Sequence, residues 1–86
     1  MAKLQRVGRA EIYLRQLGWT NIRVRSQGET ARIEVSPQAI QRFVNETDLE
    51  ALTEKFQELG FLFVTLDLEG YKSGKLNRGV EQKSSQ

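Results

Sequence analysis

The sequence of 86 residues predicts one small α+β domain, in which a three-stranded mixed sheet carries its helices mainly on one face. Apolar residues recur every three to four positions in some segments, which is typical of helices, and every second position in others, which is typical of strands. Glycine and proline separate these segments. The predicted order of elements is α-β-β-α-α-β.

The first half of the chain predicts a helix followed by a hairpin. A helix is expected over residues 6–17, because its apolar residues share one face and Gly18 follows where a helix typically ends. Apolar and charged residues then alternate over residues 22–25 and 31–35, as in half-buried strands. The turn-forming residues 26–29 between them favour an antiparallel hairpin.

The second half predicts two helices and a last strand. Ser36 is the expected N-cap of a short helix with Pro37 at its first position, and residues 47–50 form a capping box for a second helix that stops at Gly60. Residues 61–68 are the most apolar stretch, so we expect this strand to be covered on both sides and to lie centrally or at an interface. Because helices connect it to the preceding strand, those two strands should run parallel.

Charge is unevenly distributed along the chain. Residues 1–25 carry six basic and one acidic residue, residues 26–71 carry three and nine, and residues 72–86 carry four and one. Such segregation fits a basic face for an anionic partner, or a molecule that packs against itself. We expect residues 1–70 to form the domain and residues 71–86 to form a flexible basic tail.

Composition excludes several classes of function. The chain contains no cysteine and no histidine, which removes thiol catalysis, disulfides and the commonest metal ligand. No apolar run approaches the roughly 20 residues that a membrane span needs, and no signal-peptide pattern opens the chain, so the cytoplasm is the expected compartment. A domain this small has little core, which makes oligomerisation a realistic option.

Three arginines on the predicted hairpin form the candidate anion-binding site. Arg23 and Arg25 are expected on the same side of their strand, with their α-carbons about 7 Å apart, and Arg32 on the neighbouring strand. Guanidinium groups present paired donors that suit phosphate and carboxylate. The alternative is that Glu34 and Glu11 neutralise them in ion pairs.

Acidic residues offer a weaker possibility of a cation site. Glu11, Glu34, Asp67 and Glu69 could hold a hard divalent cation or act as acid and base. They show no recognisable ligand spacing, so salt bridges are the favoured interpretation, and we predict neither a metal nor a cofactor.

Two strings in the sequence resemble the C-terminal segment of the LarE family. They are ARIEV at residues 31–35 and FLFVTLDLEGYKSGKLN at residues 61–77, and weaker matches extend the similarity over residues 6–78. LarE proteins are ATP-dependent sacrificial sulfur transferases of the PP-loop superfamily. The more specific part of the resemblance includes the following motif residues: Asp67, Glu69, Tyr71, Ser73 and Asn77.

The resemblance implies an accessory role. The family adenylates a nicotinate-derived mononucleotide with an N-terminal PP-loop domain and donates sulfur from its own cysteine, whereas this sequence has neither a PP-loop string nor a cysteine. The family's basic pair falls on Arg23 and Arg25 and its acidic positions on Glu11 and Glu34. Arg42 stands where the family tends to be acidic, which argues against a carried-over metal site.

The leading hypothesis is therefore a non-catalytic relative of the LarE C-terminal domain. It would self-associate or dock on a separate PP-loop protein, and bind a phosphate or nucleotide anion through its arginines. One alternative is a nucleic-acid-binding module that uses the basic N-terminal stretch and tail. Another is a small scaffold protein without a ligand.

Overall fold

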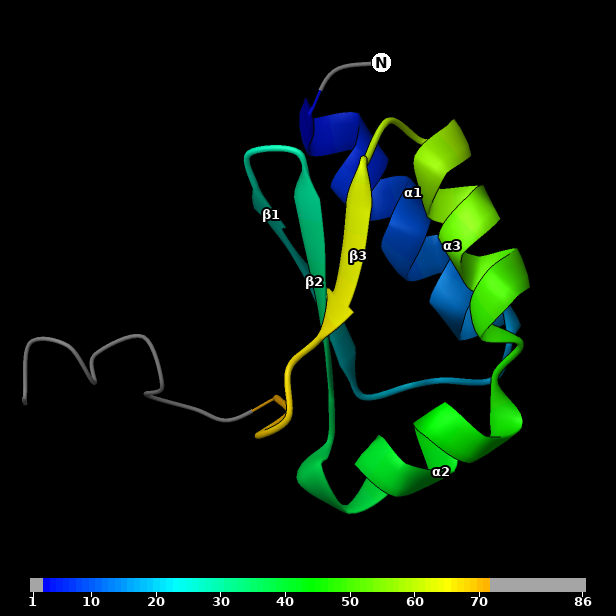
Figure 1. The fold of residues 1–86 in the computed structure, drawn as a ribbon. Helices are drawn as coiled ribbons and strands as arrows, with labels where there is room; N and C mark the ends of the chain where they lie inside the picture. The colour runs from blue at the N-terminus through cyan, green and yellow to red at the C-terminus, as the bar shows by residue number, and fades with distance from the viewer. Residues whose placement is uncertain (1–2, 72–86) are drawn as a thin grey trace, which may run out of the picture.

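The computed structural model describes residues 3–71 and confirms the predicted fold class, a three-stranded mixed sheet with three α-helices (Figure 1). The elements follow the predicted order. They are α1 (Lys3–Gln16), β1 (Ile22–Gln27), β2 (Thr30–Val35), the 3-10 helix η1 (Pro37–Ala39), α2 (Ile40–Glu46), α3 (Leu49–Glu58) and β3 (Phe63–Leu66).

The sheet has the order β1-β2-β3, with β1 and β2 antiparallel and β2 and β3 parallel, as predicted. In the hairpin register Arg23 lies opposite Glu34 and Arg25 lies opposite Arg32. In the parallel pair Thr30 lies opposite Phe63. This register decides which side chains share a face of the sheet.

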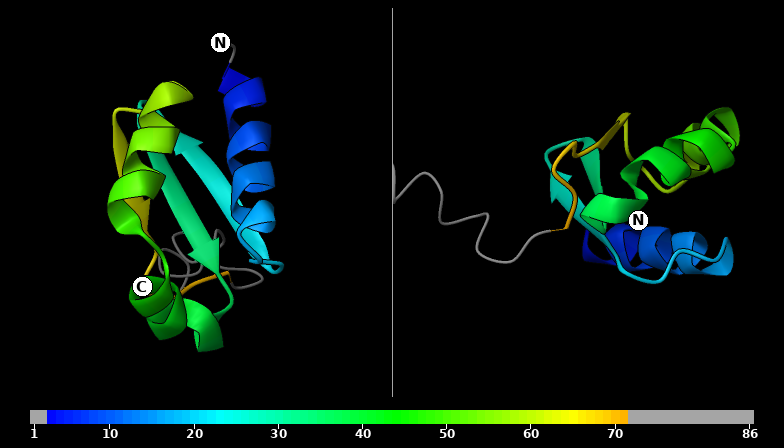
Figure 2. Two further views of the ribbon diagram at one scale, coloured as in Figure 1. Left: turned by 90° about the vertical axis from the view of Figure 1, so that its right-hand side faces the viewer. Right: turned by 90° about the horizontal axis from the view of Figure 1, so that it is seen from below.

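The core lies between the sheet and two helices. Figure 2 shows α1 and α3 side by side on one face of the sheet, running in opposite directions, with α2 beyond one end. Apolar residues of both layers meet there, as the alternating strands and amphipathic helices require. The buried apolar residues are Ala10, Leu14, Trp19, Ile22, Val24, Ala31, Ile33, Val35, Phe43, Leu52, Phe56, Leu59 and Phe61.

The last strand differs from its prediction. β3 is shorter than residues 61–68 and lies at the edge of the sheet. Of the two positions expected for it, the central one is therefore wrong, and the position at an interface stays a prediction. Its apolar character has two separate causes: Phe61 is buried in the connection before the strand, whereas Phe63 is 63% exposed on the face away from the helices. A continuous apolar run therefore combined a core residue with a surface residue.

Two helix starts also differ in detail. Ser36 makes no side-chain capping bond, and the residues after it form η1 before α2 begins. The N-cap of α3 is Asp48 rather than Thr47, because its carboxylate accepts a hydrogen bond from the Ala51 amide at 3.0 Å. Such a cap satisfies one of the free amides of the first turn.

Candidate anion-binding site

The predicted arginines share the outer face, which we define as the sheet face away from α1 and α3. Residues that alternate with Arg23, Arg25, Arg32 and Glu34 along their strands are buried in the core, so these four side chains lie on the opposite side. The hairpin register places them in two neighbouring pairs. The structure therefore brings together the three arginines, named here the arginine cluster, as the sequence predicted.

Glu34 lies within the arginine cluster and is only 2% exposed. Its carboxylate accepts a hydrogen bond from Nε of Arg25 at 3.3 Å and pairs with Nη2 of Arg32 at 3.2 Å. Asp67 adds a longer ion pair to Nε of Arg32, at 3.7 Å. A buried carboxylate needs such partners, so the two arginines stabilise Glu34, and Glu34 in turn orients the two arginines.

Arg23 differs from the other two arginines. It is exposed and forms no ion pair with any residue between 3 and 71. Its guanidinium carbon lies 5.6 Å from the centre of the Tyr71 ring. The side chain of Tyr71, through a hydrogen bond and its charge, raises the pKa of Arg23, and the charge of Glu11 adds to this effect.

The residues after β3 cross the end of β2 and bring Tyr71 to Arg23. We name residues 67–71 the strap. Within it Asp67 accepts from the Glu69 amide at 2.9 Å, and the Tyr71 amide donates to the carbonyl of Val35. Gly70 permits this close approach, because its φ is +80° and a Cβ there would lie 2.4 Å from the Val35 carbonyl oxygen.

The structure describes three of the five motif residues that carry the resemblance. Asp67, Glu69 and Tyr71 belong to the strap, next to the arginine cluster. Ser73 and Asn77 lie outside the described residues, as does nearly all of the predicted tail.

Glu11 lies at the edge of the sheet, where its charge acts on Arg23 but it forms no ion pair with any of the three arginines. One of its carboxylate oxygens accepts from the Val24 backbone amide at 3.0 Å, and the other lies 3.8 Å from Nη2 of Arg15. Since β1 is an edge strand, the amide of Val24 needs a partner outside the sheet. Glu11 therefore secures α1 to β1.

Sequence reasoning missed the most buried cation among the described residues, Arg6, which is 4% exposed. Its two terminal nitrogens donate to the carbonyls of Gly60 and Gly28, each at 2.6 Å, and its guanidinium lies 4.2 Å from the Phe61 ring centre. It thereby connects α1 to the hairpin turn and to the connection before β3. A signal was present: Arg6 stands four residues before Ala10, in line with the buried stripe of the helix.

The described residues offer neither a metal centre nor a membrane-spanning helix. Residues 3–71 contain no group of three or more histidine, cysteine, aspartate or glutamate side chains placed to hold a metal ion. Within the same range no helix combines the length and the apolar character needed to cross a bilayer.

Comparison with known proteins connects the chain to a region of a larger enzyme. No protein-family model matches it. Pyridinium-3,5-bisthiocarboxylic acid mononucleotide synthase of Lactiplantibacillus plantarum is 44% identical over 68 residues, which are 79% of this chain and 24% of that protein. The chain is homologous to a region of this LarE enzyme. The resemblance seen in the sequence is confirmed to that extent.

A second relative supports the same connection. The uncharacterized protein slr1717 of Synechocystis sp. is 64% identical over 76 residues, which are 88% of this chain and 28% of that protein. The chain thus spans about a quarter of the length of either relative.

Proposed function

We propose that this chain is a non-catalytic domain related to a region of LarE, which holds a phosphate or nucleotide anion with Arg23 and Arg25. In this proposal it works by docking on a PP-loop sulfur transferase or by self-association. The observation that carries the anion half is the position of Arg23, which is exposed beside Arg25 without an ion pair to any described residue.

The arrangement of donors supports an anion at this place. Arg25 contacts Glu34 through Nε, and in this proposal its terminal nitrogens donate to the ligand. Arg23 lies two residues away on the same strand and face. Two guanidiniums held in this way match the oxygens of a phosphate group. Because Glu34 already restrains Arg25, this arginine would lose little conformational freedom when the anion binds.

The tyrosine of the strap favours a nucleotide over a bare phosphate. Tyr71 is half-buried beside Arg23, at the edge of the proposed anion site. An aromatic ring next to a phosphate-binding arginine offers a surface on which a base can stack.

The same outer face supports docking on a larger protein. Phe63 is 63% exposed on this face and Leu68, at the start of the strap, is 83% exposed. The relatives have about three quarters of their length outside the region shared with this chain. A partner that covered Phe63 would also approach the arginine cluster, and the anion would then lie between the two proteins.

The alternative of a nucleic-acid-binding module has less support. Glu34 and Asp67 lie among the three arginines and reduce the positive field that a polyphosphate chain needs. A single phosphate group requires only Arg23 and Arg25. The absence of cysteine from the sequence supports the non-catalytic part of the proposal, because sacrificial sulfur donation of the LarE type requires that residue.

An amide-shift titration with inorganic phosphate and with a nucleoside monophosphate tests the anion site. We expect shifts at β1 and Tyr71, and Arg23→Ala should weaken binding by about tenfold, the effect of losing one charge-assisted hydrogen bond. Arg9→Ala, on the opposite side of the molecule, is the matched control and should leave the affinity unchanged. Unmoved amides around Arg23 at about 10 mM of both compounds would refute the anion site.

A further inference from the structure

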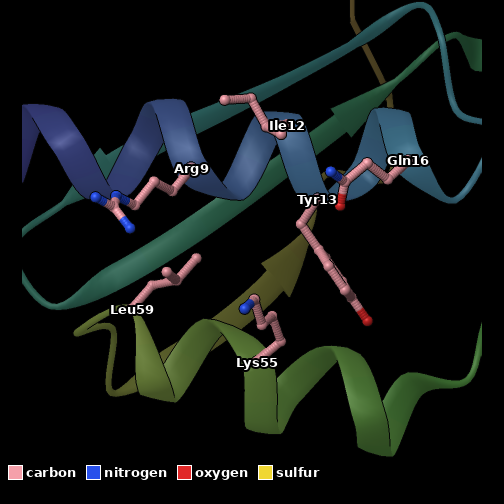
Figure 3. A pocket seen from close by; sticks show the side chains of 6 residues that line it. All are labelled: Arg9, Ile12, Tyr13, Gln16, Lys55 and Leu59. Carbon is pink, nitrogen blue, oxygen red and sulfur yellow. The ribbon is translucent and has the colours of Figure 1, made fainter.

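A groove separates α1 from α3 on the side of the molecule opposite the arginine cluster. Its volume is ≈ 420 Å³, and Figure 3 shows the side chains that line it. Arg9 and Tyr13 of α1 and Lys55 and Leu59 of α3 project toward the space between the two helices (Figure 3). The lining positions on α1 are residues 9, 12, 13 and 16, a spacing typical of a surface against which another helix packs.

This helical face, defined as the solvent side of α1 and α3, carries uncompensated charges of both signs. Arg9 and Lys55 form no ion pair with another residue of the described range, and Lys55 instead lies 5.9 Å from the Tyr13 ring centre. Along α3, Glu50, Glu54 and Glu58 are exposed at four-residue spacing and are likewise without an ion pair in this range. The face is therefore basic along α1 and the groove, and acidic along α3.

Gly8 and Ile12 mark the exposed side of α1 as a surface open to close approach. Glycine inside a helix is less favourable than alanine, and no atom lies within 4 Å of the place that a Cβ on Gly8 would occupy. Nothing in residues 3–71 therefore requires a glycine there, whereas a second helix packed closely on α1 would. Ile12, one turn later, is 53% exposed and supplies the apolar contact.

We propose that the helical face is the surface on which a second copy of this chain packs, with α1 of each copy across α3 of the other. The inference rests on the self-association half of the proposed function and specifies its surface. A two-fold interface must be self-complementary, and this face presents both a basic and an acidic helix. A free anion would engage only Arg9 and Lys55 of the groove, whereas a second copy would also pair the exposed carboxylates of α3, so it fits the charge pattern better.

Sedimentation equilibrium of the full chain, at about 0.05 M and about 0.5 M NaCl, tests this interface. We expect a dimer that weakens at the higher salt concentration. Arg9→Glu, or the pair Glu54→Arg with Glu58→Arg, should weaken the dimer by about tenfold or more. All three substitutions combined in one chain should restore it, because a two-fold interface then pairs the exchanged charges.

Two further variants separate an interface defect from a folding defect. Gly8→Gln should raise the unfolding temperature of the monomer, measured at low protein concentration, since it improves the helix. It should nevertheless weaken the dimer, because the longer side chain blocks close approach. Arg23→Glu on the outer face should leave the dimer intact while abolishing phosphate binding. The two halves of the proposed function can thus fail independently.

Three results would overturn the inference. One is a wild-type chain that stays monomeric at about 1 mM at the lower salt concentration. Another is a folded triple charge exchange that does not dimerise although the wild type does. The third is a loss of the dimer in Arg23→Glu and not in Gly8→Gln, which would assign self-association to the outer face.

Discussion

Single arginines perform different tasks in this molecule according to what surrounds them. Arg6 is enclosed by backbone carbonyls and an aromatic ring, Arg25 and Arg32 hold a buried carboxylate, and Arg23 is exposed beside a tyrosine. Arg6 contributes to stability through buried hydrogen bonds. Arg23 retains free donors, which makes it the residue most suited to a ligand.

Replacing Arg6 should destabilise the fold. Arg6→Met keeps a long helix-forming side chain but removes the donors to Gly28 and Gly60, so we expect the free energy of unfolding to fall by about 1–3 kcal/mol. Urea denaturation measures the change. Arg9→Met, exposed one turn later on the same helix, is the matched control. At a protein concentration low enough to keep the chain monomeric, it should change stability by less than about 0.5 kcal/mol. Equal effects of the two variants would contradict the role given to Arg6.

Among the elements, the strap and the hairpin act together. The hairpin aligns the arginine cluster through its register, and the strap adds Asp67 and Tyr71 from a segment more than thirty residues away. Neither element forms the site alone. The Val35 carbonyl, which accepts from the Tyr71 amide, is where the two elements meet.

Gly70→Ala should displace the strap. Its backbone conformation is unfavourable for alanine and the added methyl group would collide with the Val35 carbonyl, so we expect a loss of about 1–3 kcal/mol in the free energy of unfolding. The ring-current shift of Tyr71 on the Arg23 side chain should also disappear from the NMR spectrum. Gly8→Ala is the control, and at a protein concentration low enough to keep the chain monomeric it should stabilise the helix by about 0.5–1 kcal/mol. An unchanged Arg23 signal in Gly70→Ala would show that the strap does not depend on this glycine.

At the scale of the whole molecule, one layer of helices covers one face of a small sheet. The covered face holds the core, whereas the outer face combines the arginine cluster with the exposed Phe63. Exposed apolar residues beside charged ones are typical of surfaces that contact another protein. The molecule therefore has two candidate contact surfaces, the outer face and the helical face, on opposite sides of the sheet.

Two phenylalanines near β3 test this division. Phe61→Thr should lower the free energy of unfolding by about 3–5 kcal/mol, because it leaves a cavity in the core, whereas Phe63→Thr should change it by less than about 0.5 kcal/mol. Thermal unfolding of both variants at low protein concentration provides the measurement. A large loss for Phe63→Thr would mean that another part of the chain or a second copy covers the outer face in solution.

Much of this arrangement could be predicted from local patterns. Alternation over residues 22–25 and 31–35 predicted the hairpin and the shared face of Arg23, Arg25 and Arg32, because side-chain direction in a strand depends only on parity. The helices of residues 6–17 and 49–59 followed from the spacing of their apolar residues in the same way. These features require information only from neighbours along the chain.

The remaining features depend on contacts between distant segments, which only the tertiary structure decided. The apolar run around Phe63 predicted a strand but could not show that it lies at the sheet edge, because strand order depends on how the crossover packs. The burial of Arg6 depends on two loops that supply its carbonyl partners and are distant from it in the sequence. Glu11 was grouped with the arginines, yet the amide of an edge strand provides its partner. Parity and periodicity determine where a side chain points, whereas burial and pairing are set by segments that the local sequence does not contain.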